Sequence, residues 1–147
     1  MDHPPSNGIT RPILESRGYG RVTALSTEAR ELLITAFTSS GYRVYDTVPN
    51  IPTPPAIVVV PDSPWLVPGR IGSNLNYEAR WRILIVIKKR QNAAETLDTE
   101  NAVDTVLGLI PTEFLVTAVN APQLNDIGAQ GTVITTEINV SIQMKES

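Results

Sequence analysis

The sequence predicts an α+β domain in which a mostly antiparallel sheet of about five strands carries two helices on one face, after an extended N-terminal arm. Two segments, near residues 26–41 and 93–110, repeat apolar residues at helical spacing, and the segments between and after them alternate or run apolar as strands do. The links between most strands are short, which favours hairpins and antiparallel pairing. The 147 residues suit one domain, so we expect residues 25–147 to form it and residues 1–24 to form the arm.

The arm is rich in residues that interrupt regular structure. It contains three prolines and three glycines and shows little apolar periodicity. Fully extended, it reaches roughly 80 Å at about 3.3 Å per residue, which is long enough to cross to another subunit. Residues 17–21 read Arg-Gly-Tyr-Gly-Arg, which resembles a nucleic-acid element of the RGG type. One copy in an acidic chain favours instead a flexible arm that happens to contain two arginines.

The first helix is predicted to begin at Ser26 and to end before Gly41. Ser26 is a capping residue type, Glu28 falls in the first turn, where the helix dipole favours an anion, and glycine is a typical helix stop. The apolar stripe expected to face the core comprises Ala29, Leu32, Leu33, Ala36 and Phe37.

Three strands are predicted after this helix. The first, Tyr42 to Asp46, is short, and the second, Ala56 to Val60, is a continuous apolar run typical of a strand covered on both faces. The third, Tyr77 to Lys88, alternates strictly. Its second face turns apolar at Leu84 and Val86, so we expect a helix or another subunit to cover it there.

A long loop is predicted between the second and third strands, from Pro61 to Asn76, because this segment holds three prolines and two glycines. Trp65 and Leu66 form an apolar tip, and Arg70 follows. Loops longer than about 12 residues in a compact domain are usually functional or disordered. Trp65 is therefore either a lid on its own domain or an anchor in a partner.

The charged residues of the third strand have a structural explanation. Arg80 and Arg82 share a face with Glu78, so cross-strand salt bridges account for them, and a contact between subunits is the alternative. Trp81 lies on the opposite face and is expected to fill the core.

The second helix is predicted from Ala93 to Ile110. Asn92 and Glu95 stand at capping-box spacing, and Pro111 lies just past the end. Its acidic residues lie off the apolar stripe and are expected to form a solvated face: Asp98, Glu100 and Asp104.

Two strands close the chain, Phe114 to Val119 and Thr132 to Met144, with a polar loop at residues 120–131 between them. The last strand alternates apolar and polar residues, so one face is expected in the core and the other in water.

Composition excludes several function classes. There is no cysteine and one histidine, His3 in the arm, so thiolate metal sites, cysteine nucleophiles, histidine-based metal centres and Ser-His-Asp triads are not expected. The net charge is −3, with 12 basic and 15 acidic residues, which disfavours tight binding to nucleic-acid phosphates. Nucleotide-binding, zinc-protease and EF-hand motifs are absent. The first 25 residues lack a basic stretch followed by an apolar one, and no run suits a membrane helix, so neither secretion nor membrane insertion is expected.

These features favour an assembly protein over an enzyme, with no cofactor and no metal. The order of elements resembles the tail terminator (tail-completion) proteins of long-tailed bacteriophages over residues 26–144. The resemblance rests on the helix ending in Gly41-Tyr42-Arg43-Val44-Tyr45, the strand at residues 54–61, the long strand with central Trp81, the acidic-faced second helix and the closing strands. The arm and the segment around Trp65 have no match in that family.

The resemblance implies a structural virion protein located in the tail or neck and assembled in the host cytoplasm. It implies a homohexameric ring that caps the tail tube, stops tube polymerisation and joins the tail to head–tail connector proteins. DNA would pass through the lumen without specific binding, and an acidic ring would repel its phosphates. The partner interface is expected at Trp65, Leu66, Arg70, Arg80, Arg82, Asn125, Asp126 and Gln130, with the arm as a strap onto a neighbouring subunit.

Three alternatives remain. One is a free-standing regulatory or antitoxin-like module, which would be a monomer or dimer whose arm folds only on its target. A head–tail connector or neck protein has a similar small ring fold and differs in its partner. A small ligand-binding or enzymatic α+β domain would need a pocket with convergent polar groups, for example around Glu78, Arg80 and Arg82.

Overall fold

The computed structural model describes residues 13–15, 22–47, 52–71, 74–89, 93–126 and 131–145. Its elements, in chain order, are β1 (Ile13–Glu15), α1 (Val22–Phe37), the short 3₁₀ helix η1 (Thr38–Ser40), β2 (Arg43–Tyr45), β3 (Ala56–Ile71), β4 (Asn74–Lys88), α2 (Ala93–Leu109), β5 (Leu115–Val119), β6 (Gln123–Asp126) and β7 (Thr132–Lys145). The α+β class is confirmed. The described strands form one seven-stranded sheet rather than one of about five, because β1 lies within the expected arm and β6 within the expected loop at residues 120–131.

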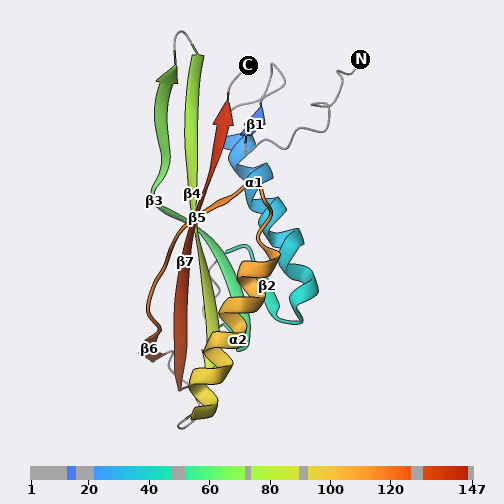
Figure 1. Cartoon of the computed structure of the whole chain (residues 1–147), viewed down its shortest axis with the longest axis vertical. Coiled ribbons are helices and arrows are strands. Elements are labelled where there is room, and N and C mark those ends of the chain that lie inside the picture. Colours follow the sequence, from blue (N-terminus) through green and yellow to red (C-terminus); the bar gives the residue numbers. More distant parts are fainter. Residues whose placement is uncertain are drawn as a thin grey trace.

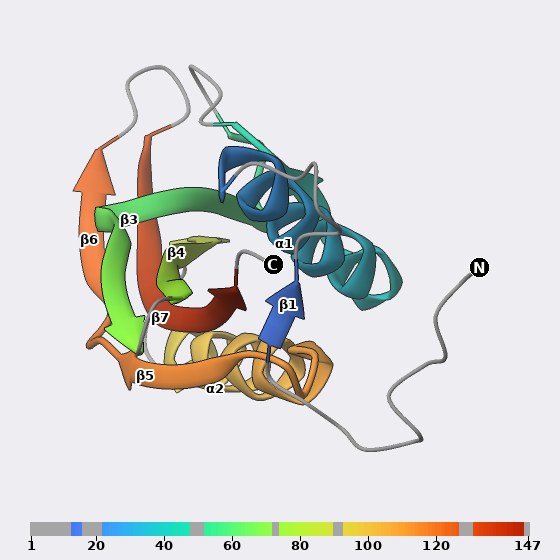
Figure 2. The ribbon, with the colours of Figure 1, turned by 90° about the horizontal axis from the view of Figure 1, so that it is seen from above.

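The long strand β7 organises the sheet. The main path is β1-β7-β4-β3-β2, and β4 runs antiparallel along nearly the whole of β7. The opposite edge of β7 is shared by β1, which is parallel to it, and by the antiparallel strands β5 and β6. The sheet is strongly curved (Figure 2).

The core lies between one face of this sheet and the two helices. Leu33 and Phe37 of α1 and Val106 of α2 are fully buried against it. The sheet contributes alternate residues of β3, β4 and β7 to the same cluster: Ile57, Val59, Ala79, Trp81, Ile83, Ile85, Ile87, Ile134, Ile138, Val140, Ile142 and Met144. The expectation that both helices pack on one face is confirmed.

The opposite face, which we call the open face, has a smaller core of its own. Ala56, Val58, Val60, Val86 and Val133 are buried together there, with Tyr45 and Leu84 packed against them. The apolar positions at Leu84 and Val86 are therefore explained within the chain, and no described helix covers them.

The first helix begins four residues before the expected cap. Val22 is its first residue and Ser26 lies inside it, fully buried, so Ser26 is not the N-cap. The expected end is correct, since η1 follows Phe37 and Gly41 adopts a left-handed φ of 87° that glycine tolerates without strain. The second helix agrees with the prediction to within one residue at its C-terminal end.

The long loop expected from Pro61 to Asn76 is wrong, because residues 61–71 and 74–76 form the outer half of the paired strands β3 and β4, which extend beyond both helices (Figure 1). Proline cannot donate a ladder hydrogen bond and is confined to sheet edges. β2 pairs only with Ala56–Val58, so β3 from Pro61 onward is an edge in the described chain, and its prolines are accommodated there. The register against β4 shifts between Pro61 and Leu66, as at a β-bulge.

Trp65 fastens the β3–β4 hairpin to α1. Its indole Nε1 donates a hydrogen bond to the Ser26 hydroxyl at 2.9 Å, and its ring meets Trp81 edge to face with centroids 6.3 Å apart. Leu66 is half-buried and packs against the main core. Of the two alternatives predicted for Trp65, the structure shows the contact with its own domain. Of the residue's surface, 36% is still exposed.

Candidate interaction surface

The described residues contain no cluster suited to catalysis by a metal ion. No group of three or more histidine, cysteine, aspartate or glutamate side chains lies close enough to hold a metal within the part of the chain that the structure describes. His3 lies outside that part. None of the described helices has the length and apolarity needed to cross a membrane.

The most unusual surface is the ribbon formed by β5 and β6, which we call the β5–β6 edge. All five residues of β5 and all four of β6 are exposed. The apolar side chains among them are open to solvent over much of their area: Leu115 65%, Val116 37%, Val119 45% and Leu124 59%. A large apolar side chain on a solvated edge strand is usually a contact surface.

Main-chain pairing, rather than side-chain packing, holds this ribbon in place. β5 pairs with β7 from Leu115↔Ser141 to Val119↔Ile138, with a register shift between Val116 and Ala118, and β6 continues the pairing towards the start of β7. Only the side of the ribbon that faces β7 is paired with another strand. The outer side has no strand partner among the described residues. Unpaired N–H and C=O groups on such an edge are a template for another chain.

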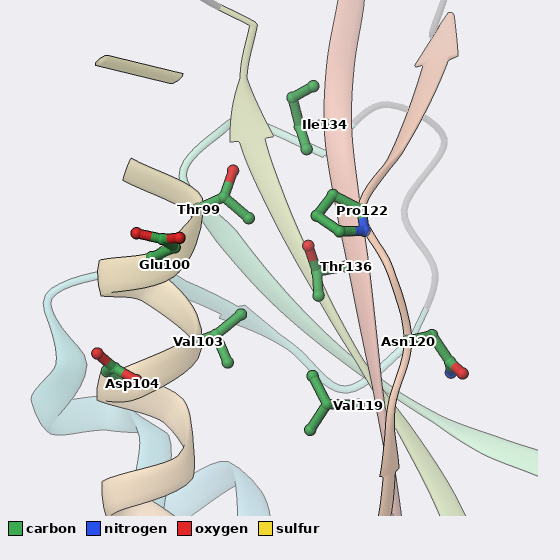
Figure 3. A pocket seen from close by; sticks show the side chains of 9 residues that line it. All are labelled: Thr99, Glu100, Val103, Asp104, Val119, Asn120, Pro122, Ile134 and Thr136. Carbon is green, nitrogen blue, oxygen red and sulfur yellow. The ribbon is translucent and has the colours of Figure 1, made fainter. Parts of the chain in front are cut away.

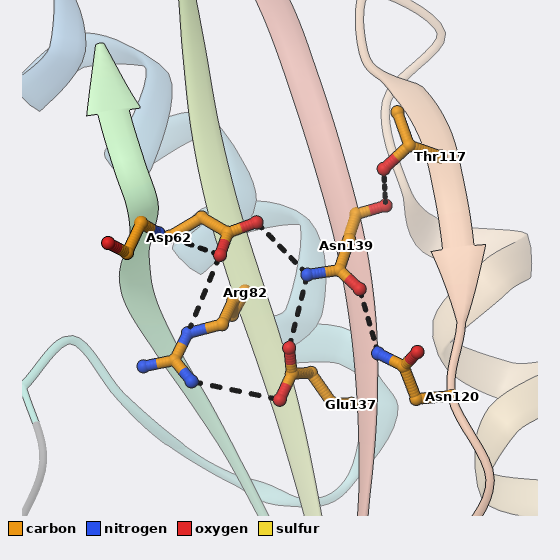
Figure 4. A network of polar contacts seen from close by, with 7 residues as sticks. Asp62, Arg82, Thr117, Asn120, Glu137 and Asn139 are labelled. Atoms are coloured by element: carbon orange, nitrogen blue, oxygen red, sulfur yellow. Dashed lines mark hydrogen bonds and ion pairs between the residues drawn. The ribbon is translucent and has the colours of Figure 1, made fainter.

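A polar network on the open face secures the middle of the ribbon (Figure 4). Asn139 Nδ2 donates to Asp62 at 3.0 Å and to Glu137 at 3.1 Å, and its Oδ1 accepts from Asn120 Nδ2 at 2.8 Å. Arg82 lies between the same two carboxylates, 4.0 Å from Asp62 and 3.7 Å from Glu137.

This network satisfies the side chain of Asn139 on both its donor and acceptor sides. In addition, the main-chain N–H of Asn120 donates to the main-chain carbonyl of Glu137 at 2.8 Å. The Thr117 hydroxyl donates to the main-chain carbonyl of Asn139 at 3.1 Å. The groups therefore bind one another, and the cluster is a structural link between β3, β4, β7 and the β5–β6 edge.

The predicted salt bridges are found for Arg82, although its partners are Asp62 and Glu137 rather than Glu78. Arg80 lies opposite Ser141 in the register and makes no ion pair with Glu78 among the described residues. Glu78 lines a hollow of about 280 Å³ together with residues of β7 and of the segment before β5, whereas Arg80 and Arg82 are not among the residues that line it.

The other sequence-predicted interface residues lie far apart. Arg70 is near the tip of the β3–β4 hairpin, paired with Leu75, whereas Asn125 and Asp126 lie in β6 opposite the first residues of β7. Asn125 donates a hydrogen bond to the Thr135 hydroxyl. Gln130 lies outside the described residues. These residues thus span the length of the sheet and do not form one patch.

Sequence reasoning missed the apolar part of the β5–β6 edge. Leu115, Val116 and Val119 lie in the predicted strand from Phe114 to Val119 and Leu124 lies in the predicted polar loop, and none of the four is among the predicted interface residues. The local sequence pattern of a strand does not show whether one of its faces is buried or both are exposed. That depends on which strands and helices lie beside the strand in the fold.

A groove runs between α2 and the segment linking β5 to β6 (Figure 3). It has a volume of about 440 Å³. Its lining residues are Thr99, Glu100, Val103 and Asp104 of α2, Val119 of β5, Asn120 and Pro122 of the linking segment, and Ile134 and Thr136 of β7. The walls are mainly apolar, and the two carboxylates stand one helical turn apart on the α2 side.

No protein-family model matches the chain, and no curated protein matches it. Among the solved structures that match is a chain of one described as "Virion of native gene transfer agent (GTA) particle". It is 14% identical, the match covers 85% of this chain and 98% of that one, and the TM-score is 0.48. A likeness this distant assigns neither a family nor a function.

Proposed function

We propose that this chain is a structural, non-enzymatic virion protein, a bacteriophage tail terminator. In this role it forms a homohexameric ring on the last ring of tail-tube protein, stops tube polymerisation and provides the surface that joins the tail to the head–tail connector. Assembly takes place in the host cytoplasm. DNA passes through the lumen without specific binding.

The observation that carries the proposal is the β5–β6 edge. The domain buries two apolar clusters, yet leaves Leu115, Val119 and Leu124 exposed on a strand edge with no described partner. An edge of this kind is an aggregation hazard unless a specific partner covers it. In a subunit of a permanent assembly, a neighbouring subunit covers such an edge.

The positions of the edges favour a ring over a two-fold dimer. The β5–β6 edge lies at one side of the sheet, while β2 and the outer half of β3 lie at the other. Contact between two different edges is head to tail, and head-to-tail contacts close into rings when the rotation permits. The specific assignment to a tail terminator rests on the resemblance in the order and spacing of the elements over residues 26–144.

Two other functions would use the same surfaces differently. A head–tail connector would form a ring but bind the portal side rather than the tail tube. A ligand-binding domain would stay monomeric and fill the groove between α2 and the β5–β6 edge with a small molecule, which its apolar walls would suit.

The test is the mass of the purified chain by light scattering, alone and with polymerising tail-tube protein, with tube lengths measured by electron microscopy. The proposal expects rings, or capped and shortened tubes. A monomer that leaves tube length unchanged contradicts it, and binding to a portal complex instead would assign the connector function.

The edge itself is tested with the double variant Leu115→Lys and Leu124→Lys. Both side chains are mostly exposed, so the monomer keeps its fold, while lysines on an edge strand block pairing with another chain. The matched control places lysines at Glu31 and Thr35, which are exposed on α1. Loss of capping in the edge variant with capping intact in the control is the expected result, and equal capping by both rejects the edge as the contact.

A further inference from the structure

The described sheet has free edges of different character on its two sides. On one side lie β2 and the outer half of β3, and on the other lie β1, β5 and β6. The outer half of β3 contains Pro61, Pro64 and Pro68, which have no N–H to donate, so it is a poor template for another strand. β5 contains a register shift, whereas β6 pairs with β7 without one. β2 and β6 are therefore regular edges on opposite sides of the sheet.

These two edges lie at the same level of the sheet and run in opposite directions. A single row of paired residues crosses from β2 to β6: Arg43, Ala56, Val86, Thr135 and Gln123. β2 is parallel to β3, and each further step to β4, β7 and β6 is antiparallel. Figure 1 shows β2 and β6 on opposite sides of the molecule. If β6 of one copy lay beside β2 of another, the sheet would continue as an antiparallel pair.

The main-chain groups of β2 that are free for such a pair belong to Val44. The N–H of Arg43 donates to the Pro55 carbonyl at 3.2 Å, so the main chain of Arg43 faces β3. Successive residues of a strand direct their main-chain groups to opposite sides, so the N–H and C=O of Val44 face away from the sheet. The side chain of Val44 packs against the main core and so lies on the helix face.

The corresponding residue of β6 is Leu124. The main-chain N–H of Asn120 donates to the Glu137 carbonyl, so the main chain of Glu137 faces the ribbon. β7 pairs with β4 without a register shift, so Thr135, two residues away, faces the ribbon as well. Gln123 lies opposite Thr135 and directs its main chain towards β7. The N–H and C=O of Leu124, the next residue, therefore face away from the sheet.

The side chains of Val44 and Leu124 also match. Leu124 lies opposite Ile134 of the main core, so its side chain is on the helix face, where it is 59% exposed. With Val44 opposite Leu124, the helix faces of the two copies stay on the same side, and the two residues exchange both N–H···O=C bonds. A shift of one residue would set the apolar side chain of Val44 against residues that face the other side.

Charge favours this head-to-tail contact over a contact between two β6 edges. Residues 91–144, which include α2, β5, β6 and β7 as far as Met144, contain seven acidic residues and no lysine or arginine. Residues 1–90 contain eleven basic residues against seven acidic ones, and Arg43 of β2 is exposed. Two acidic regions repel each other, whereas an acidic region attracts a basic one.

We propose that β6 of one copy pairs with β2 of the next copy, antiparallel and with Leu124 opposite Val44, so that the sheet continues from subunit to subunit. This proposal deepens the proposed function and rests on its self-assembly. The contact is short, because each edge strand offers few outward main-chain groups. Neighbouring contacts and the tail tube therefore add to it in the assembled ring.

The chain has no cysteine, so an engineered pair reports this contact without background. Opposite residues of a hydrogen-bonded antiparallel pair have Cα atoms about 5.5 Å apart, which is within the range of a disulfide. The full-length variant Val44→Cys with Leu124→Cys is oxidised alone and with polymerising tail-tube protein, and is run on a non-reducing gel. The matched control, Val44→Cys with Gln123→Cys, places the second thiol on the adjacent exposed residue of β6, whose side chain lies on the other face. The expected result is a ladder of covalent multimers from the Leu124 pair and far less from the Gln123 pair.

The single variants separate a head-to-tail contact from a two-fold one. Chains that carry only Leu124→Cys should stay monomeric on oxidation, and should form covalent dimers when mixed with chains that carry only Val44→Cys. Covalent dimers of the Leu124→Cys chain alone would mean that two β6 edges meet, which overturns the proposal.

A proline tests the main-chain part of the contact. Leu124→Pro removes the outward N–H and leaves the N–H of Gln123, which faces β7. The matched control, Leu124→Ala, shortens the side chain and keeps the N–H. Self-association measured by light scattering should be about two- to tenfold weaker for the proline variant than for the alanine variant, which is the effect of one hydrogen bond. Circular dichroism checks that both variants stay folded, and equal self-association of the two rejects main-chain pairing at Leu124.

The cross-link also separates this proposal from the terminator function. Equal cross-linking of the Leu124 and Gln123 pairs, or none from either, overturns the pairing of β6 with β2. Capped tubes without the cross-link reject this pairing alone. Cross-linked multimers that leave tubes uncapped reject the terminator function and keep the pairing.

Discussion

Trp65 offers the sharpest test of how the β3–β4 hairpin is held against the domain. Truncation of a fully buried Trp or Phe to Ala costs about 3–5 kcal/mol. Trp65 is 36% exposed, so about two thirds of that effect applies, and Trp65→Ala should lower the free energy of unfolding by about 2–3 kcal/mol. About 1 kcal/mol of this belongs to the hydrogen bond from Nε1 to Ser26, and the rest to the contact with Trp81 and the buried area.

Trp65→Phe separates the two contributions, because a phenyl ring keeps the aromatic contact and lacks the indole N–H. It should cost about 1 kcal/mol, and combining it with Ser26→Ala should cost less than the sum of the single variants, because both remove the same hydrogen bond. Urea unfolding followed by circular dichroism measures each value. At a slope of about 1–3 kcal/mol per molar urea, the midpoint of Trp65→Ala moves down by roughly 0.7–3 M.

An unchanged urea midpoint for Trp65→Ala would refute this account of the hairpin. If the variant then also failed to cap tail tubes, Trp65 would be a partner anchor whose contacts with Trp81 and Ser26 add nothing to stability. If stability falls as expected and capping survives, the partner role predicted for Trp65 is rejected.

The remaining predictions use the same urea assay. Gly41→Ala should destabilise by about 1 kcal/mol because its φ is 87°, whereas Gly108→Ala should stabilise by about 0.5 kcal/mol, because Gly108 lies in α2 and an added Cβ there meets nothing within 4 Å. Equal effects at the two glycines would contradict this. Asn139→Ala should cost about 1–3 kcal/mol by removing the centre of the network with Asp62, Glu137 and Asn120, while Thr117→Val, which removes one exposed hydroxyl bond, should stay within about 0.5 kcal/mol of wild type. A Thr117 effect as large as that of Asn139 would reject the network as the link between β7 and the β5–β6 edge.

Local periodicity was sufficient to predict much of this fold. The stripe from Ala29 to Phe37 and the alternation from Tyr77 to Lys88 are set by which residues can share a buried face, and the structure buries those faces. The end of the first helix was predictable for a similar reason, since Gly41 needs no distant neighbour to adopt its positive φ.

The errors arose where neighbours in space decide the outcome. Prolines at 61, 64 and 68 indicate a loop unless the segment is known to lie at a sheet edge. The segment lies at an edge because β2 pairs with β3 only as far as Val58, which the sequence does not show. Ser26 was a plausible cap until Trp65, 39 residues away, provided a partner for its hydroxyl inside the helix. Likewise, Asp62 and Glu137 could not be assigned to Arg82 before the register of β3, β4 and β7 was known.

The way the β5–β6 edge is attached explains why its apolar residues are available to a partner. Its position depends on the main-chain ladder to β7 and on the Asn139 network, and neither uses the side chains of Leu115, Val119 or Leu124. Polar substitutions at these positions therefore leave the free energy of unfolding nearly unchanged while altering contact with another chain. The Asn139 network has the reverse property, since its loss lowers the free energy of unfolding and leaves the apolar side chains of the ribbon in place. Stability and assembly are thus carried by different residues of the same ribbon, which allows the proposed function to be tested on a protein that remains folded.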